Sequence, residues 1–154
     1  MPMILEVQSG AYAPSLCEPA SSFEEKLALF PRGAIGGFDD DGHLLGYGVT
    51  LPWRGDDIVP LGKSIGSIPS DPDAIFIHDV ATSPHARGTG VAGQLVERIF
   101  AIASEMRITQ FSLVAVQGSE PFWMHFGFQP AREFVYAGVT ATRMTLERPS
   151  LKNG

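Results

Sequence analysis

A strand, a glycine-rich turn and an amphipathic helix follow one another in residues 74–106, and this unit constrains the fold most strongly. Residues 74–82 are dense in apolar and β-branched side chains, as in a buried strand. Residues 89–106 place apolar side chains at three- and four-residue spacing, which predicts a helix. A second apolar, strand-like run follows at 111–116. A helix that joins two strands in this way is a crossover, so strands 74–82 and 111–116 are predicted to be parallel neighbours.

The remaining elements are predicted to be mostly antiparallel. An Asp-Gly pair at 41–42 links two strand-like runs, which predicts a hairpin. The other predicted strands lie at 4–7, 33–38, 43–51, 131–137 and 142–148, the other helices at 11–30 and 119–126, and an irregular connection at 52–73. Such long connections often cover sites, so 52–73 is a candidate substrate lid. The sequence therefore predicts one α/β domain, 1–154, with a mixed, mostly antiparallel sheet of six or seven strands. Its central parallel pair is flanked by helices.

The charge balance narrows the class of partner. Eleven Lys and Arg against seventeen Asp and Glu give a net charge of −6. Binding of nucleic acid needs a basic face, so this balance argues against it. A cationic substrate fits the balance, and so does simple solubility. No apolar window is long enough to span a bilayer and no secretory signal is visible, so we expect a cytoplasmic protein that does not enter a membrane.

Cysteine and acidic residues give no metal site. The single cysteine, Cys17, allows neither an internal disulfide nor a pair of thiolate ligands, and a reducing cytoplasm is the default. Three consecutive acidic residues at 39–41 lack the rest of a calcium-binding loop. We interpret them as a solvated turn, and the sequence predicts no bound metal.

The glycine-rich turn predicts a binding site for a phosphate group. Glycines let the backbone approach an anion, and the first N–H groups of the following helix point at it. Residues 88–93 also match G-x-G-x-x-G, the pattern of dinucleotide-binding folds. However, five residues separate this turn from its strand, residues 111–118 offer no acidic partner for a ribose, and hairpins precede the motif. A dinucleotide is therefore disfavoured, and a P-loop is excluded because no Gly-Lys-Ser/Thr follows.

Two motifs resemble the GCN5-related N-acetyltransferase (GNAT) family. The first is a strand and a proline, then Arg/Gln-x-x-Gly-x-Gly/Ala opening a helix, and it is filled here by Pro84, Arg87, Gly90 and Ala92. The second is an aromatic-aromatic-x-x-x-Gly-Phe element, which corresponds to FWMHFGF at 122–128. Both motifs stand in the family's order and at about its spacing, and the predicted strand order agrees over nearly the whole chain.

The resemblance implies direct transfer of an acetyl group from acetyl-CoA to a primary amine. The pyrophosphate of the coenzyme would rest on the glycine turn, and its pantetheine arm would pair with the preceding strand. The residues implied in coenzyme binding are Val80, Ala81, Thr82, Arg87, Gly88, Thr89, Gly90, Val91, Ala92, Gly93, Ser119 and Trp123. Alternatively, Arg87 caps the turn and Ser119 caps the short helix. The acceptor, a small-molecule or peptide amine, stays open, another acyl-CoA is an alternative donor, and a homodimer is the family's habit.

The residues leave alternatives for the proton transfers. The amine must lose a proton and the departing thiolate should gain one. His78 is the candidate base, and Asp79 faces the opposite side unless a bulge intervenes; alternatively His78 is a buried residue bonded to Asp79 or to the backbone. Family members often carry a tyrosine where Trp123 stands, so Tyr136 or His125 is considered as the acid. The missing tyrosine keeps open a non-catalytic acyl-CoA-binding module.

Overall fold

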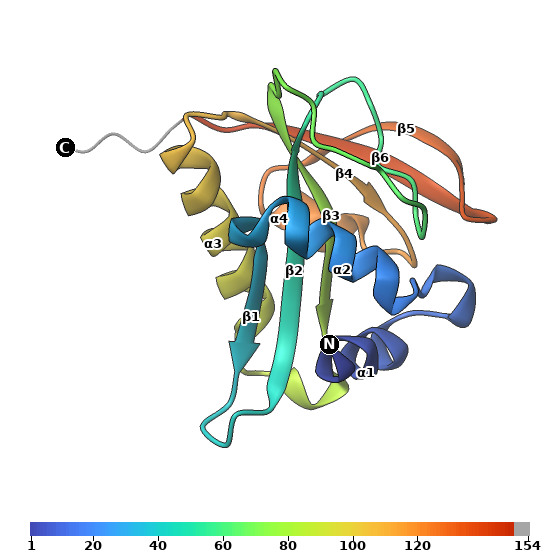
Figure 1. The fold of residues 1–154 in the computed structure, drawn as a ribbon, viewed down its shortest axis with the longest axis vertical. Coiled ribbons are helices and arrows are strands. Elements are labelled where there is room, and N and C mark those ends of the chain that lie inside the picture. The colour runs from blue at the N-terminus through green and yellow to red at the C-terminus, as the bar shows by residue number, and fades with distance from the viewer. Residues whose placement is uncertain (150–154) are drawn as a thin grey trace.

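The computed structural model describes residues 1–149, which contain six strands and four α-helices (Figure 1). The helices are α1 (Pro2–Ala11), α2 (Ala20–Leu29), α3 (Val91–Glu105) and α4 (Glu120–His125). The strands are β1 (Ala34–Phe38), β2 (Leu44–Trp53), β3 (Ala74–Thr82), β4 (Gln110–Ala115), β5 (Gln129–Tyr136) and β6 (Val139–Glu147). Within this part of the chain, no helix is both long and apolar enough to cross a membrane. The last five residues of the predicted domain, 150–154, lie outside the described residues.

The strands form one sheet in the order β1-β2-β3-β4-β6-β5. β3 and β4 are parallel, and every other neighbouring pair in the sheet is antiparallel. The predicted mixed sheet with a central parallel pair, joined by the crossover helix α3, is therefore confirmed. The count is six because the strand predicted at 4–7 does not form.

Residues 4–7 lie inside helix α1 instead. Pro2 occupies its first turn, where the missing N–H costs nothing and the fixed φ favours a helix. Ile4, Val7 and Ala11 recur at helical spacing and belong to the cluster around the buried ring of Tyr47. Three apolar residues among four positions fit a strand or a buried helix equally well, so periodicity alone could not separate the two.

The helix predicted at 11–30 is interrupted. Pro14 opens a 3-10 turn and Pro19 is the N-cap of α2, so the chain between them leaves the helical path. Glu18 lies in this break and is 4% exposed. The Gln8 side chain fixes its backbone, donating to the carbonyl at 3.0 Å and accepting from the N–H at 2.8 Å. The prolines and Gln8 thus determine where this buried acid lies.

The helices cover the two faces of the sheet separately. On one face α1 and α2 bury Val7 and Phe23 against Tyr47 of β2, and Figure 1 shows α2 crossing in front of β2 and β3. On the other face α3 and α4 pack around a larger apolar cluster that includes Ile77 and Trp123.

The connection between β2 and β3, residues 54–73, has no helix or strand. Glu25 of α2 accepts three hydrogen bonds from residues 64–66 of this loop. Tyr136 of β5 donates to the Val59 carbonyl at 2.7 Å. The loop is therefore tied to both α2 and β5, and its role as a lid over the substrate stays a prediction.

Candidate functional site

A cavity opens between β3 and β4 where their pairing stops. The two strands pair through Ile75–Ile77 and Phe111–Leu113, and residues 78–82 of β3 have no partner on β4. The cavity has a volume of about 390 Å³ and is lined by 78–82, the end of β4, α4 and Ala92 of α3. His78 is partly exposed although its side chain is 0% exposed, so its backbone faces outward. Unpaired main-chain groups of β3 are therefore available to a ligand.

The turn between β3 and α3 leaves backbone groups open. Gly88 and Gly90 have φ angles of 78° and 76°, in the left-handed region that favours glycine. A Cβ added at either position would meet no atom within 4 Å, so no side chain fills the space around these two glycines. Gly90 is also the N-cap of α3, whose first N–H groups lack acceptors inside the helix. Such a turn fits an anionic group.

Most of the predicted coenzyme residues lie at this cavity. Those that line it are Val80, Ala81, Thr82, Arg87, Ala92, Ser119 and Trp123. Those that form the adjoining turn and first helical turn are Gly88, Thr89, Gly90, Val91 and Gly93. The Thr89 hydroxyl donates to the Ala86 carbonyl at 2.5 Å and accepts from the Val91 N–H at 3.3 Å, so it closes the turn. Within residues 1–149 the Arg87 side chain makes no hydrogen bond or ion pair, so it is free to meet a ligand.

Helix α4 forms an aromatic wall of the cavity. Trp123 is 7% exposed, and its ring packs edge-on against Phe122 and Phe128 at 5.0 and 5.5 Å between centroids. Ser119 is the N-cap of α4, as predicted, although its side chain makes no capping hydrogen bond. His125 is exposed at the end of α4 and does not line the cavity.

A β-bulge at His78 decides which side chains share a face of the sheet. The register of β2 against β3 skips His78. Ile77 faces the α3 cluster, whereas His78 and Asp79 contact Glu18 and Tyr12 from the α1–α2 side. Both side chains therefore lie on the same face, because the extra residue resets the alternation that a regular strand imposes.

Asp79 is a buried carboxylate between two tyrosines. Tyr12 donates its hydroxyl to Oδ1 and Tyr47 donates to Oδ2, both at 2.6 Å. Burial raises the pKa of Asp79 above its ordinary value, although the two hydroxyls oppose that rise. The pKa values of Tyr12 and Tyr47 are also raised, first by burial and then by the charge of Asp79. A carboxyl group with a raised pKa is suited to accept a proton.

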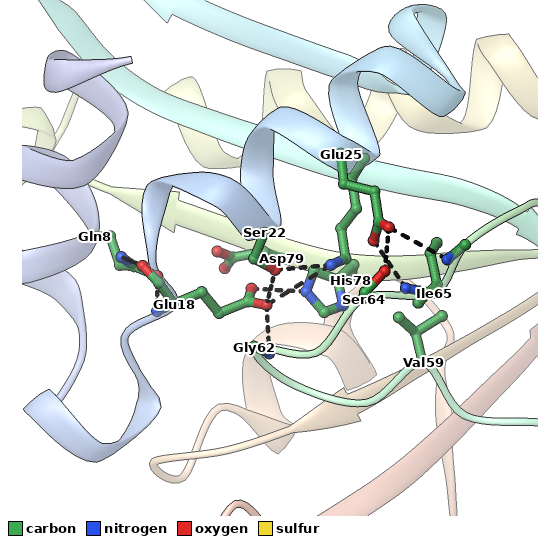
Figure 2. Close-up of polar contacts among 12 residues, drawn as sticks. Gln8, Glu18, Ser22, Glu25, Val59, Gly62, Ser64, Ile65, His78 and Asp79 are labelled. Atoms are coloured by element: carbon green, nitrogen blue, oxygen red, sulfur yellow. Dashed lines mark hydrogen bonds and ion pairs between the residues drawn. The ribbon is translucent and has the colours of Figure 1, made fainter.

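His78 is paired with Glu18 rather than with its strand neighbour or the backbone (Figure 2). Its Nε2 lies 2.7 Å from Glu18 Oε1, and the two side chains are 0% and 1% exposed. Nδ1 is buried and has no hydrogen-bond partner among the described residues. The role of His78 as a base therefore stays a prediction.

Glu18 binds several groups at once. It accepts from the Ser22 hydroxyl and the Gly62 N–H, each at 2.7 Å, and lies 3.8 Å from the buried Lys26 ammonium (Figure 2). Burial by itself would raise the pKa of Glu18, but the contacts with His78, Ser22 and Gly62 together lower it to about 2. Glu18 is therefore an anion that orients the imidazole and holds the 54–73 loop over it.

Tyr136 lies close to the same acids but does not line the cavity. Its pKa is raised, first by burial and then by the charges of Glu18 and Asp79. Its hydroxyl is engaged by the Val59 carbonyl. The chain has three tyrosines, and the two others donate directly to Asp79. All three therefore gather around the two buried acids.

Tyr12 and Glu18 complete the site, and the sequence analysis selected neither. Both stand in the segment interpreted as one helix, where Pro14 and Pro19 were the local signal of an irregular path. Their contacts with β3 join residues 67 and 60 positions apart in the chain. Partners at that separation leave no periodic trace in a single sequence.

Comparison with known proteins gives a family and several similar structures. The model of the acetyltransferase (GNAT) family matches residues 2–128, and no curated protein matches the sequence. The loading GNATL domain of CurA from Lyngbya majuscula is similar at a TM-score of 0.81 and 9% identity, over 95% of this chain and 92% of that one. The GphF GNAT-like decarboxylase in complex with isobutyryl-CoA has a TM-score of 0.77 and 12% identity, over 95% of this chain and 93% of that one. The ribosomal-protein-S18-alanine N-acetyltransferase from Escherichia coli has a TM-score of 0.66 and 12% identity, over 99% of this chain and 90% of that one.

These structural similarities concern the fold, since the sequence identities are low. The family match spans most of the chain and includes β3, the glycine turn, α3 and α4. It ends at Phe128, the last residue of the aromatic motif. The chain belongs to the acetyltransferase (GNAT) family.

Proposed function

We propose that the protein is an N-acetyltransferase that moves an acetyl group from acetyl-CoA to a primary amine. The observation that carries this proposal is the cavity between β3 and β4, which joins unpaired main chain at 78–82 to a buried carboxylate, Asp79. A ligand laid along the strand would end beside a group that can accept a proton. The other proposed catalytic residues, His78 and Tyr136, belong to the same buried cluster.

The residues around the cavity fit acetyl-CoA, which supplies an activated thioester. The N–H groups of the turn at 88–93 would hold the pyrophosphate, with Arg87 adding a positive charge. The main chain at 80–82 would pair with the pantetheine arm, and Ser119 and Trp123 would form the wall of the cavity on the α4 side. The GphF structure, which has the same fold, is described with isobutyryl-CoA.

The acidic character of the cluster favours an amine as the acceptor. Glu18 and Asp79 lie within one buried group, and the net charge of the chain is −6. An ammonium group is attracted to such a place, and it must lose a proton before it can act as a nucleophile. We propose that Asp79 receives that proton. The acceptor is a small-molecule or peptide amine, and the single cysteine accords with action in the cytoplasm.

The proposal is tested by release of CoA thiol from acetyl-CoA with a panel of primary amines. We expect thiol release that depends on the amine, together with a product heavier by one acetyl group in mass spectrometry. Tight binding of CoA without thiol release for any amine would instead indicate the non-catalytic binding module.

The glycine turn gives a separate prediction about the coenzyme. Gly90→Ala is expected to raise the Kd for CoA at least tenfold, roughly 1.4 kcal/mol, because the new Cβ enters the space where phosphate would approach. Gly42→Ala is the matched control, since Gly42 also has a positive φ of 84° and no atom within 4 Å of an added Cβ. Both variants place an alanine at a positive φ, so calorimetric titration with CoA separates the binding effect from the effect of backbone strain. Equal affinities would contradict the assignment.

A second candidate is decarboxylation of a carboxylated acyl-CoA, which needs no amine. One observation favours it: the side chains of His78 and Glu18 are 0% and 1% exposed beneath the tied loop, so the site is closed on that side. In addition, Trp123 stands where members of the family often carry a tyrosine that can act as the acid. The GphF protein is described as a GNAT-like decarboxylase. Release of CO₂ from malonyl-CoA without an amine, faster than any amine-dependent thiol release, would replace the transfer proposal by this one.

A further inference from the structure

Tyr12 bridges the opening between β3 and β4. Its hydroxyl lies 2.6 Å from Asp79 Oδ1 and 3.1 Å from the Val80 carbonyl, both on β3. Gln117, just beyond β4, holds the backbone on either side of Tyr12. The Gln117 amide donates to the Ala11 carbonyl at 3.1 Å and accepts from the Ala13 N–H at 2.9 Å. The ring is thereby fixed across the cavity from both sides.

The two tyrosines that contact Asp79 differ in their access to the cavity. Tyr47 is 1% exposed, its ring packs edge-on against Phe23, and it does not line the cavity. Tyr12 is partly exposed and does line it. Both hydroxyls donate to the carboxylate at the same distance of 2.6 Å. A ligand in the cavity can therefore contact Tyr12 but not Tyr47.

We propose that Tyr12 is a catalytic residue that relays the proton from the substrate ammonium to Asp79, an inference that rests on the N-acetyltransferase function proposed above. The ammonium N–H bond breaks and its proton goes to Tyr12 Oη, while the Tyr12 hydroxyl proton goes to Asp79 Oδ1. The neutral amine then takes the acyl group, and the second nitrogen proton goes to the departing thiolate. The sum is one ammonium and one acyl-CoA converted to one amide, one CoA thiol and one proton, which leaves Asp79 for solvent by the same path.

The electrostatics of the site favour coupling between the two proton movements. Burial and the charge of Asp79 raise the pKa of Tyr12, so a free phenolate would be costly. Passing the hydroxyl proton on to Asp79 avoids that species. The titratable groups whose charge or hydrogen bonds act with Asp79 are Tyr12, Cys17, Glu18, Tyr47, His78 and Tyr136.

The relay is tested by comparing Tyr12→Phe with Tyr47→Phe across pH, using acetyl-CoA and the best acceptor of the amine panel. Each variant removes one hydrogen bond that lowers the pKa of Asp79. In both, the pH below which kcat falls is therefore expected to move upward. On the high-pH plateau, kcat of Tyr12→Phe is expected to stay at least tenfold below wild type, because the relay is gone. Tyr47→Phe is expected to recover to within about threefold.

The outcomes separate the relay from the function on which it rests. Equal plateau values in the two variants would overturn the relay while amine-dependent turnover of the wild type stands. A wild type without such turnover would remove both proposals. CoA affinity and the thermal midpoint report on folding. Gln117→Ala is the second variant, because Gln117 is exposed: its plateau kcat is expected to fall with the pH profile in place, and an unchanged kcat would also count against the relay.

Discussion

Asp79→Asn is expected to lower kcat for acyl transfer about 10²- to 10⁴-fold, the range that a positioned general base contributes. Asparagine keeps the shape of the side chain and can still bond Tyr12 and Tyr47, but it cannot take up a proton at neutral pH. Because the lost interaction concerns proton transfer, the Kd for CoA is expected to stay close to that of wild type. Assays of thiol release measure kcat, and titration with CoA measures the Kd separately.

The matched control for this prediction is Asp40→Asn. Asp40 is an exposed carboxylate in the β1–β2 hairpin, so the variant makes the same change of charge outside the site. Its kcat is expected to match that of wild type. Wild-type kcat is also expected to fall as the pH drops through the raised pKa of Asp79, since the base must be deprotonated. A kcat for Asp79→Asn within threefold of wild type would rule out Asp79 as the proton acceptor.

Glu18→Ala is expected to lower the free energy of unfolding by about 3–5 kcal/mol, the usual cost of removing one partner from a buried ion pair. The Lys26 ammonium, whose side chain is 0% exposed, would remain buried without its counter-ion, and His78 would lose its partner. The Gly62 N–H of the loop would lose its acceptor as well. Urea unfolding followed by circular dichroism measures the change.

The matched control is Glu105→Ala, which removes the partner of Arg32 in an ion pair whose side chains are 58% and 52% exposed. Exposed pairs contribute less than about 1 kcal/mol, so this variant is expected to remain near wild type. The pKa of Glu18 is lowered from 4.5 to about 2. Its stabilising contribution is therefore fully present above pH 4.5 and is lost as the pH falls toward 2. Glu18→Ala should lack that part of the acid dependence, and equal acid sensitivity would contradict the assignment.

The sequence by itself determined the parallel pair, the crossover helix and the glycine turn. These features depend on local periodicity and on the chirality of the chain, both of which a single sequence contains. Residues 74–82 were predicted with the bounds that β3 has in the structure. The proposed coenzyme side of the site lies in the same segment, because a strand, a turn and a helix N-terminus are neighbours in the chain. Residues 4–7 were predicted wrongly because three apolar residues among four positions do not distinguish a strand from a buried helix.

The tertiary structure alone decided the arrangement of the acids. One extra residue in β3, at His78, reverses the facing of Asp79, and such a bulge is set by pairing with β2. Tyr12 and Glu18 reach β3 from 67 and 60 residues away, so no local pattern links them to it. Secondary structure is a property of neighbours in the chain. The partners of a buried charge are chosen by packing and by the cost of leaving that charge alone, and these exist only in the folded molecule.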